Sequence, residues 1–364
     1  MSKPPSAGIV ASILLAASIA WAAPRSGEEI YTATCASCHG SDGRGAPASQ
    51  TGLSLAPLDF TDCEKTNREP DQDWHAVIAR GGPARGFHRL MPAFGEVVTE
   101  PEQEAVLVYA RGFCADPVWP RGDLNLPRPL VTEKAFVEDE VVVSTAVATR
   151  SPRNVDSALI YEQRFLRRQM FEVKVPFGVA QVPDDGREAG IGDIALALKS
   201  MLVGSLDAGT ALSVGAEVIL PTGNQDKGFG KGVVIFEPFL AFGQLLPWDS
   251  FVQAQVGAEI PAQEAAGVEN EGFVRGVVGT TFTHGRFGRS FTPMVEVLAS
   301  RELASEAPTS LDLVPQVQVS LSRRQHVLAC LGASLPTANR EGRSPSVMAY
   351  LLWDWFDGGL LEGW

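Results

Sequence analysis

The chain has little of several residue types. Only five cysteines and five histidines occur in 364 residues, and 30 Lys and Arg stand against 43 Asp and Glu, for a formal net charge of -13. The basic residues form no cluster, which argues against nucleic acid as a partner. No Walker loop, nucleophile–base arrangement or paired-carboxylate motif is present, so no enzymatic activity is predicted. At this length, two domains are expected.

Long apolar runs are also missing beyond the N-terminus. The first residues contain one lysine, an apolar run from Gly8 to Ala20 and the triplet Ala20-Trp21-Ala22. This pattern predicts a signal peptide over residues 1–22 and an exported mature protein. No cysteine follows the cleavage point, so no lipid anchor is expected. Because no later run reaches helical length, a β-barrel is the remaining way for the mature chain to span a membrane.

One short motif combines two of the rare residue types: Cys35-Ala36-Ser37-Cys38-His39. Two thiols at this spacing can hold a haem through thioethers while the adjacent imidazole reaches the iron. A zinc site would need a fourth ligand at matching spacing, and a redox-active cysteine pair would need a strand–helix context. Neither is present. We therefore predict one covalently bound haem c, held by Cys35 and Cys38, with His39 as an axial ligand.

The second axial ligand must come from a small set of candidates. Met91 lies in RLMPAFG, after the glycine-rich stretch GGPARGFH and before a proline that favours extended backbone at the methionine. His75, within a predicted helix beside Trp74, and His88 are the alternatives. We expect Met91, because His/Met ligation is the usual pairing in cytochromes c.

Three helices are predicted around these ligands. One runs from Gly27 to Cys38, one begins with Asp71 as N-cap and stops at residues 81–83, and one begins at Thr99 with a capping box completed by Glu102. With CASCHG at residues 35–40 and LMPAF at residues 90–94, residues 24–116 resemble a class I monohaem cytochrome c. The resemblance implies electron transfer by a six-coordinate haem with axial ligands His39 and Met91. The surroundings of the haem are expected to include Tyr31, Leu55, Leu90 and Phe94.

Three cysteines lie outside the haem motif. Cys63 and Cys114 both fall in the small N-terminal domain, and an oxidising compartment favours a disulfide between them. Cys330 lies far from both and is expected to fill space on the polar side of a strand.

A proline-rich stretch separates the two halves of the chain. Residues 115–132 read ADPVWPRGDLNLPRPLVT, which predicts a semi-rigid extended linker over residues 117–135.

From residue 136 to residue 364 the pattern changes to strict alternation of apolar and polar residues. In FVQAQVGAEI, for example, Val252, Ala254 and Val256 alternate with Gln253 and Gln255. About twelve such segments are predicted, starting near residues 140, 158, 169, 191, 210, 232, 250, 272, 290, 310, 324 and 345. The predicted fold is thus a small all-α cytochrome c domain followed by an all-β antiparallel up-and-down transmembrane barrel of about twelve strands.

Two architectures can use this alternation, a soluble β-sandwich and an outer-membrane barrel. Long strands, aromatic residues near strand ends and ionisable residues on the polar face favour the barrel. The aromatic residues are Trp248, Phe282, Tyr350, Trp353, Trp355 and Phe356, and the ionisable residues are Glu172, Lys174, Asp193, Lys199, Glu217, Glu237, Glu259, Arg275 and Glu296. The ionisable residues either pair with one another and fill a small pore or line a permeation path; both interpretations stay open.

The second half also resembles the outer-membrane proteins related to phenol degradation. The segments VPFG, GIGD, VILPTG, FEPFLAFG and YLLWDWFDGG carry this resemblance, which implies an outer-membrane location and no defined substrate. The aromatic end of the last strand is either Trp353 to Phe356 or Trp364.

Together these features lead to one main hypothesis. The chain is expected to be a c-type cytochrome that transfers electrons in the periplasm and is tethered to the outer membrane by its barrel. Its expected partners are periplasmic redox proteins and outer-membrane lipid, with no nucleic acid; no oligomeric state is predicted. The alternative is an outer-membrane channel for a small solute, with the haem domain as a redox sensor or gate.

Overall fold

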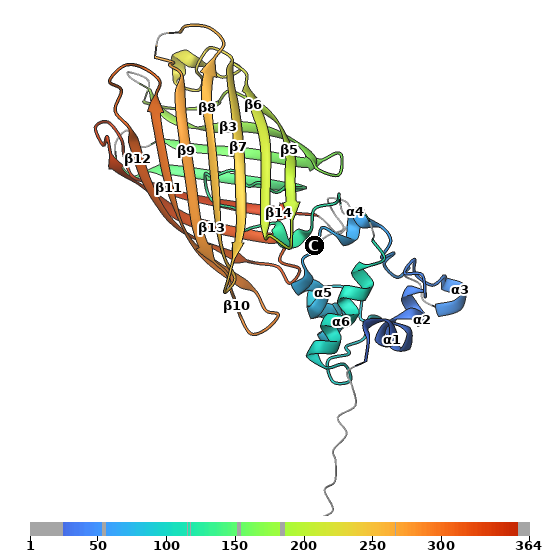
Figure 1. Cartoon of the computed structure of the whole chain (residues 1–364). Helices are drawn as coiled ribbons and strands as arrows, with labels where there is room; N and C mark the ends of the chain where they lie inside the picture. The colour runs from blue at the N-terminus through green and yellow to red at the C-terminus, as the bar shows by residue number, and fades with distance from the viewer. Residues whose placement is uncertain are drawn as a thin grey trace, which may run out of the picture.

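The computed structural model describes residues 25–52, 56–114, 116, 118–150, 154–182, 186–265 and 267–355. The predicted signal peptide, Leu55, Phe356 and Trp364 lie outside these residues. A small helical domain and a large barrel lie against each other (Figure 1).

The helical domain contains six short α-helices joined by loops. They are α1 (Gly27–Ile30), α2 (Ala36–His39), α3 (Ala48–Thr51), α4 (Cys63–Thr66), α5 (Asp71–Arg80) and α6 (Glu100–Arg111), with the π-helical turn η1 (Tyr31–Cys35) between α1 and α2 and the 3-10 helix η2 (Gly82–Arg85) after α5. Because α1, η1 and α2 follow one another without a gap, they form the predicted first helix. Helix α5 starts one residue earlier than expected: Pro70 is its N-cap and Asp71 its first residue. No helix in the described part of the chain is long and apolar enough to cross a membrane.

The first and last helices of this domain cross at Gly27. A Cβ atom added there would lie 2.1 Å from the carbonyl oxygen of Ala105, so only glycine permits this approach. The predicted capping box is present, because the backbone and hydroxyl of Thr99 both donate to the Glu102 carboxylate at 2.9 Å. Hydrogen bonds from Arg25, and then from Thr99, lower the pKa of Glu102 to about 2.

The second domain is an antiparallel sheet that closes on itself. Its strands are β1 (Glu140–Ala148), β2 (Val155–Arg164), β3 (Gln169–Val182), β4 (Gly186–Ile191), β5 (Ala195–Ser205), β6 (Thr210–Ile219), β7 (Ile235–Leu246), β8 (Ser250–Pro261), β9 (Glu271–Thr280), β10 (Phe282–Thr283), β11 (Ser290–Glu302), β12 (Ser310–Ser320), β13 (Val327–Ala338) and β14 (Ser346–Asp354). The short β4 and β10 pair with β3 and β11, so the wall has twelve strands. Strand β14 pairs with β1 from Glu140↔Asp354 to Ala148↔Ser346 and closes the barrel. The predicted number of strands is confirmed.

The outer face of the barrel is apolar. Large side chains there stay exposed, among them Leu198 at 62%, Val274 at 57% and Leu331 at 57%. Polar side chains on the same strands point inward and are buried, such as Glu172, Lys199, Gln253, Gln255 and Glu296. In a soluble sandwich the apolar face would be covered by a second sheet, and this alternative is therefore wrong. An apolar outer surface around a polar interior is the pattern of a membrane-spanning barrel.

The two ends of the barrel differ. Turns at one end are short, such as residues 206–209 and 247–249, whereas connections at the other end include residues 220–234 and 262–270. The helical domain lies at the short-turn end, where the barrel strands also begin and end at Glu140 and Asp354 (Figure 1).

The segment between the domains differs from the extended linker that the sequence predicts. After the 3-10 helix η3 (Gly122–Leu124), residues 125–139 lie inside the barrel and contact its inner wall; we call this segment the plug. Leu126, Phe136 and Val137 of the plug are 6%, 1% and 0% exposed. Proline prevents regular secondary structure here, as expected, but the segment is an internal part of the barrel rather than a spacer in solvent.

Candidate functional site

The predicted haem motif lies on the first helix of the helical domain. Cys35 is the last residue of η1, and Cys38 and His39 belong to α2, which ends at Gly40. Gly40 has a φ of 75°, which turns the chain away from the helix. The hydroxyl of Tyr31, a core residue beneath the motif, donates to the Gly40 carbonyl at 2.8 Å. Both thiols are free of a disulfide, and burial raises the pKa of Cys35.

The His39 ring is held in a defined orientation. It stacks on Phe60, with ring centroids 4.4 Å apart, and its Nδ1 lies 3.4 Å from the carbonyl oxygen of Leu58. Burial lowers the pKa of His39 and favours the neutral ring. A neutral imidazole that donates from Nδ1 to a carbonyl keeps the lone pair of Nε2 for a metal. His39 therefore has the arrangement of an axial ligand.

The loop that carries Met91 folds back onto the C-terminal end of α5. The amide of Gly82 donates to the Met91 carbonyl at 3.0 Å, and the amide of Phe94 donates to the Ile78 carbonyl at 2.9 Å. A Cβ atom at Gly82 would lie 2.4 Å from the carbonyl oxygen of His88. The glycines before Met91 are thus needed for the loop to approach the helix closely.

The two alternative ligands, His75 and His88, each have a hydrogen-bond partner. His75 Nε2 lies 2.8 Å from a carboxylate oxygen of Glu104 on α6, so this ring is engaged at the surface of the domain. His88 is exposed, and its Nδ1 accepts a hydrogen bond from the amide of Leu90 at 3.2 Å. Met91 has no such competing partner for its sulfur among the described residues.

Apolar side chains near these ligands are left uncovered. Leu58, Phe87 and Leu90 are 42%, 38% and 41% exposed, although each belongs to a segment that contacts His39 or carries Met91. Phe94, in contrast, packs against the core of the domain. Uncovered apolar side chains on the segments next to the oriented imidazole and to Met91 suit a flat, largely apolar group such as a haem.

The other two cysteines of the helical domain are joined. Cys63 at the start of α4 and Cys114 after α6 form a disulfide, with 5.2 Å between their Cα atoms. The bond ties the segment after the haem motif to the end of the last helix.

The helical domain is fixed to the barrel by buried contacts near the Met91 loop. Arg85 in η2 is 2% exposed; it pairs with Asp73 of α5 and donates to the carbonyl of Phe287, in the turn before β11, at 2.6 Å. The guanidinium of Arg324 donates to the Gly86 carbonyl at 3.3 Å and lies 4.5 Å from the centroid of the Phe87 ring. The loop that presents Met91 is therefore also the surface that meets the barrel.

The centre of the plug is bound by one buried carboxylate of the wall. Glu296 on β11 is 0% exposed. It accepts hydrogen bonds from the amides of Leu130, Val131 and Thr132 at 2.8, 3.2 and 2.8 Å and from the Thr132 hydroxyl at 2.6 Å. The sequence places Glu296 correctly on the polar face but does not indicate that it binds the backbone of a distant segment.

Further contacts hold the two halves of the plug. The Tyr350 hydroxyl donates to the Arg128 carbonyl at 2.6 Å, Gln253 donates to the Pro127 carbonyl at 2.8 Å, and Lys199 pairs with Glu133 at 2.5 Å. Arg128 itself pairs with Glu140 and Glu162. These residues show that polar inward-facing side chains of the wall recognise the plug.

Not all of the aromatic residues predicted near the strand ends face outward. Trp248 and Phe282 are exposed, at 89% and 48%. Tyr350, however, is 5% exposed and points into the lumen, and Trp355 is 6% exposed and stacks against Tyr161 with 5.9 Å between ring centroids. The alternation of β14 explains the difference, because Tyr350 shares a face with the other inward residues of that strand.

The plug leaves a cavity of about 710 Å³ within the barrel. Eight of the nine predicted inward ionisable residues line it: Glu172, Lys174, Asp193, Lys199, Glu217, Glu237, Glu259 and Arg275. Some of them are paired, such as Lys174 with Glu217 at 2.9 Å. Cys330 also faces inward, as expected, and its thiol donates to Gln316 at 3.4 Å.

Comparison with known families agrees with the helical domain described above. Residues 22–109 match the family model described as cytochrome C oxidase, cbb3-type, subunit III. The helical domain is a cytochrome c domain. A domain of this kind binds haem and serves electron transfer. Residues 128–260, which include most of the plug, match the family model described as "Putative MetA-pathway of phenol degradation".

Solved structures with a similar barrel include two outer-membrane proteins. The KdgM porin is 9% identical over 59% of this chain and 98% of its own, with a TM-score of 0.40 for its complex with oligogalacturonate. An outer membrane channel from Pseudomonas putida F1 is 13% identical over 63% of this chain and 99% of its own, with a TM-score of 0.41. No curated protein matches the chain.

Proposed function

We propose that the chain is an electron-transfer protein, in which a haem c is bound covalently by Cys35 and Cys38 in a cytochrome c domain fixed to the periplasmic end of an outer-membrane barrel. The observation that carries the proposal is the orientation of His39, whose Nδ1 faces the Leu58 carbonyl while Nε2 is left for iron. The haem supplies reversible one-electron transfer. His39 and Met91 would hold the iron, which would then have no free position for a substrate.

The position of the domain supports this role. The short turns of outer-membrane barrels face the periplasm, and the cytochrome c domain lies at the short-turn end. Helices α2 and α3 lie on the side of the domain away from the barrel (Figure 1). The haem motif is therefore presented to soluble redox proteins of the periplasm, and the net charge of -13 favours basic partners.

The axial ligand is tested with three forms of the full-length protein in detergent. Met91→Ala opens a coordination position, so added imidazole changes the haem absorption spectrum. The wild-type protein and the matched control His88→Ala show no such change. If His88→Ala opens the position and Met91→Ala does not, the assignment of Met91 is overturned. Haem that stays on the chain after denaturation supports covalent attachment, and its release contradicts it.

One observation favours a second function: the plug is the direct continuation of the cytochrome c domain, which contacts the barrel. The plug begins directly after η3 and lies inside the barrel, while the Met91 loop contacts barrel turns through Arg85 and Arg324. A change at the haem can therefore reach the plug. In this alternative the barrel is a channel for a small solute, gated by the redox state of the haem.

Single-channel conductance of the haem-loaded protein distinguishes the two functions. Electron transfer with the barrel as an anchor predicts no open-pore current in either redox state. A current that follows the redox state of the haem would establish a gated channel.

A further inference from the structure

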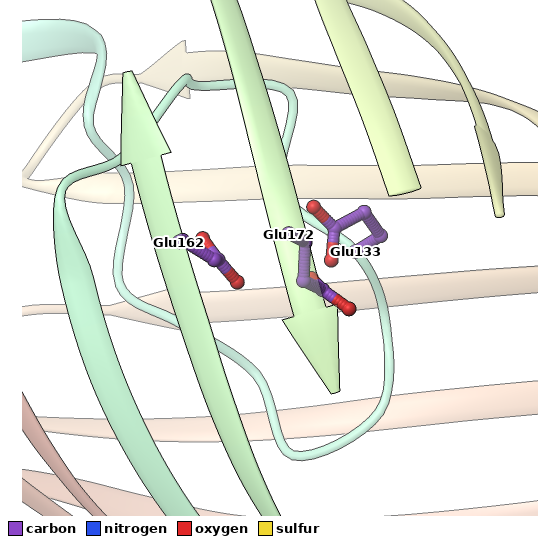
Figure 2. A group of neighbouring side chains, drawn as sticks. All are labelled: Glu133, Glu162 and Glu172. Atoms are coloured by element: carbon purple, nitrogen blue, oxygen red, sulfur yellow. The ribbon is translucent and has the colours of Figure 1, made fainter. Parts of the chain in front are cut away.

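Three carboxylates from separate parts of the chain meet inside the barrel (Figure 2). Glu133 belongs to the plug, Glu162 to β2 and Glu172 to β3. One oxygen from each lies within 4.8 Å of the others. Two oxygens that bind the same Ca²⁺ at about 2.4 Å each are at most about 5 Å apart, so this spacing suits a shared ion.

Glu162 and Glu172 are buried and Glu133 is partly buried, and all three carboxylates are incompletely paired. Glu172 is 7% exposed and has no hydrogen-bond or ion-pair partner among the described residues. Glu162 is 0% exposed; Arg128 binds its Oε1 at 2.7 Å, and its Oε2 has no partner. Lys199 engages only Oε1 of Glu133. Buried carboxylate oxygens without a partner are costly, and an ion would compensate them.

The local charges leave a negative excess. Arg128 pairs with both Glu140 and Glu162, Lys134 pairs with Glu138 and lies 3.9 Å from Glu140, Lys199 pairs with Glu133, and Lys174 pairs with Glu217. Together with Glu172, these are six carboxylates against four cations. The difference of two negative charges equals the charge of one divalent cation.

We propose that Glu133, Glu162 and Glu172 bind a divalent cation, with Ca²⁺ as the best match, and that this ion fastens the plug to the barrel wall. The donors are all oxygens, which excludes the nitrogen and sulfur ligands preferred by zinc. Calcium accepts irregular sets of six to eight oxygens, including water. Water has access from the cavity of about 710 Å³, which Glu133 and Glu172 line.

The ion would link the plug to the wall of the barrel. Glu133 directly follows Thr132, which binds Glu296 on the opposite part of the wall. With the ion present, β2, β3 and β11 hold adjacent residues of the plug. Removal of the ion leaves the Glu133 carboxylate held by Lys199 alone, beside the backbone hydrogen bond to Gln255, and places uncompensated negative charge between the plug and the wall.

Calorimetric titration of CaCl₂ into the full-length protein in detergent tests the proposal. The wild-type protein is expected to bind one Ca²⁺ per chain, with a Kd on the order of 10⁻⁴–10⁻³ M, as in extracellular calcium sites. Glu172→Gln is expected to weaken binding at least tenfold. The matched control is Glu259→Gln, which removes a carboxylate from the same cavity but outside the cluster.

The variants must first show the heat-dependent gel mobility of a folded barrel. A second variant, Glu133→Gln, tests the plug side of the site and is also expected to weaken binding. The proposal is overturned if the wild-type protein binds no Ca²⁺ up to 10⁻² M, if Glu172→Gln binds as tightly as wild type, or if Glu259→Gln weakens binding equally. None of these results depends on the haem, so the proposed electron transfer is tested separately.

Discussion

Glu296 fixes the plug, and its removal should open the barrel. In Glu296→Ala, the amides of Val131 and Thr132 lose their acceptor inside the protein, whereas the amide of Leu130 keeps Gln316. An unsatisfied buried N–H costs about 1–3 kcal/mol. Taking the lower value for each of the two amides, because water can enter the cavity, the bound plug is destabilised by about 2 kcal/mol. Since about 1.4 kcal/mol corresponds to a factor of ten, the released fraction should rise about thirtyfold.

The assay is single-channel recording of full-length protein in planar bilayers with a chelator present, so that no divalent ion holds Glu133. Wild type should be closed for nearly all of the recording, and Glu296→Ala should show frequent openings. Glu259→Ala is the control, because Glu259 lines the same cavity without a hydrogen bond to the plug. Equal open times in wild type and Glu296→Ala would refute the role of this carboxylate, and frequent openings in Glu259→Ala would show that any loss of lumen charge suffices.

Three further results are expected. Cys63→Ser removes the disulfide, which links residues 51 positions apart, and should destabilise the cytochrome c domain by about 4 kcal/mol. Urea titrations followed by haem absorbance measure this loss, and an unchanged urea midpoint of unfolding would contradict the prediction. Because the pKa of Glu102 is lowered to about 2 in the folded domain, its contribution is present above the ordinary carboxyl range and is lost as pH falls toward 2. Glu102→Gln should therefore lower stability at pH 7 and have no effect near pH 2, and an equal effect at both pH values would oppose this reasoning. Arg85→Leu leaves Asp73 buried without its partner, so amide hydrogen exchange in α5 should become at least tenfold faster. The control is Arg89→Leu, which replaces an exposed arginine of the same loop and should leave the exchange rate unchanged. Similar exchange rates in both variants would show that Arg85 does not hold the docked domain.

The positions of strands and helices could be predicted because each depends on a pattern of neighbouring residues in the sequence. Alternation with period two sets strand positions, and strands predicted to start near 169, 210, 250, 290 and 310 start at those residues. The capping box at Thr99 similarly sets the start of α6. These features depend on a few neighbouring residues, so one sequence suffices to find them.

The plug and the docking surface could not be predicted in the same way. Their contacts join residues far apart in the chain, such as Glu296 with Thr132 and Arg85 with Phe287. The prolines of residues 115–132 exclude regular structure but do not distinguish a segment in solvent from one inside a barrel. Tyr350 was expected in an aromatic belt because aromatic residues favour both interfaces and buried positions; only its place in the alternation shows that it faces inward.

The seam between β1 and β14 has a consequence for biogenesis. The plug directly precedes β1, the first strand of the wall, and β14 is the last strand to be synthesised. The cytochrome c domain and the start of β1 both lie at the short-turn end, so the plug enters and leaves the lumen on the same side of the barrel. Pairing of β14 with β1 closes the wall next to the residue where the plug ends, so closure of the barrel and confinement of the plug take place at one position.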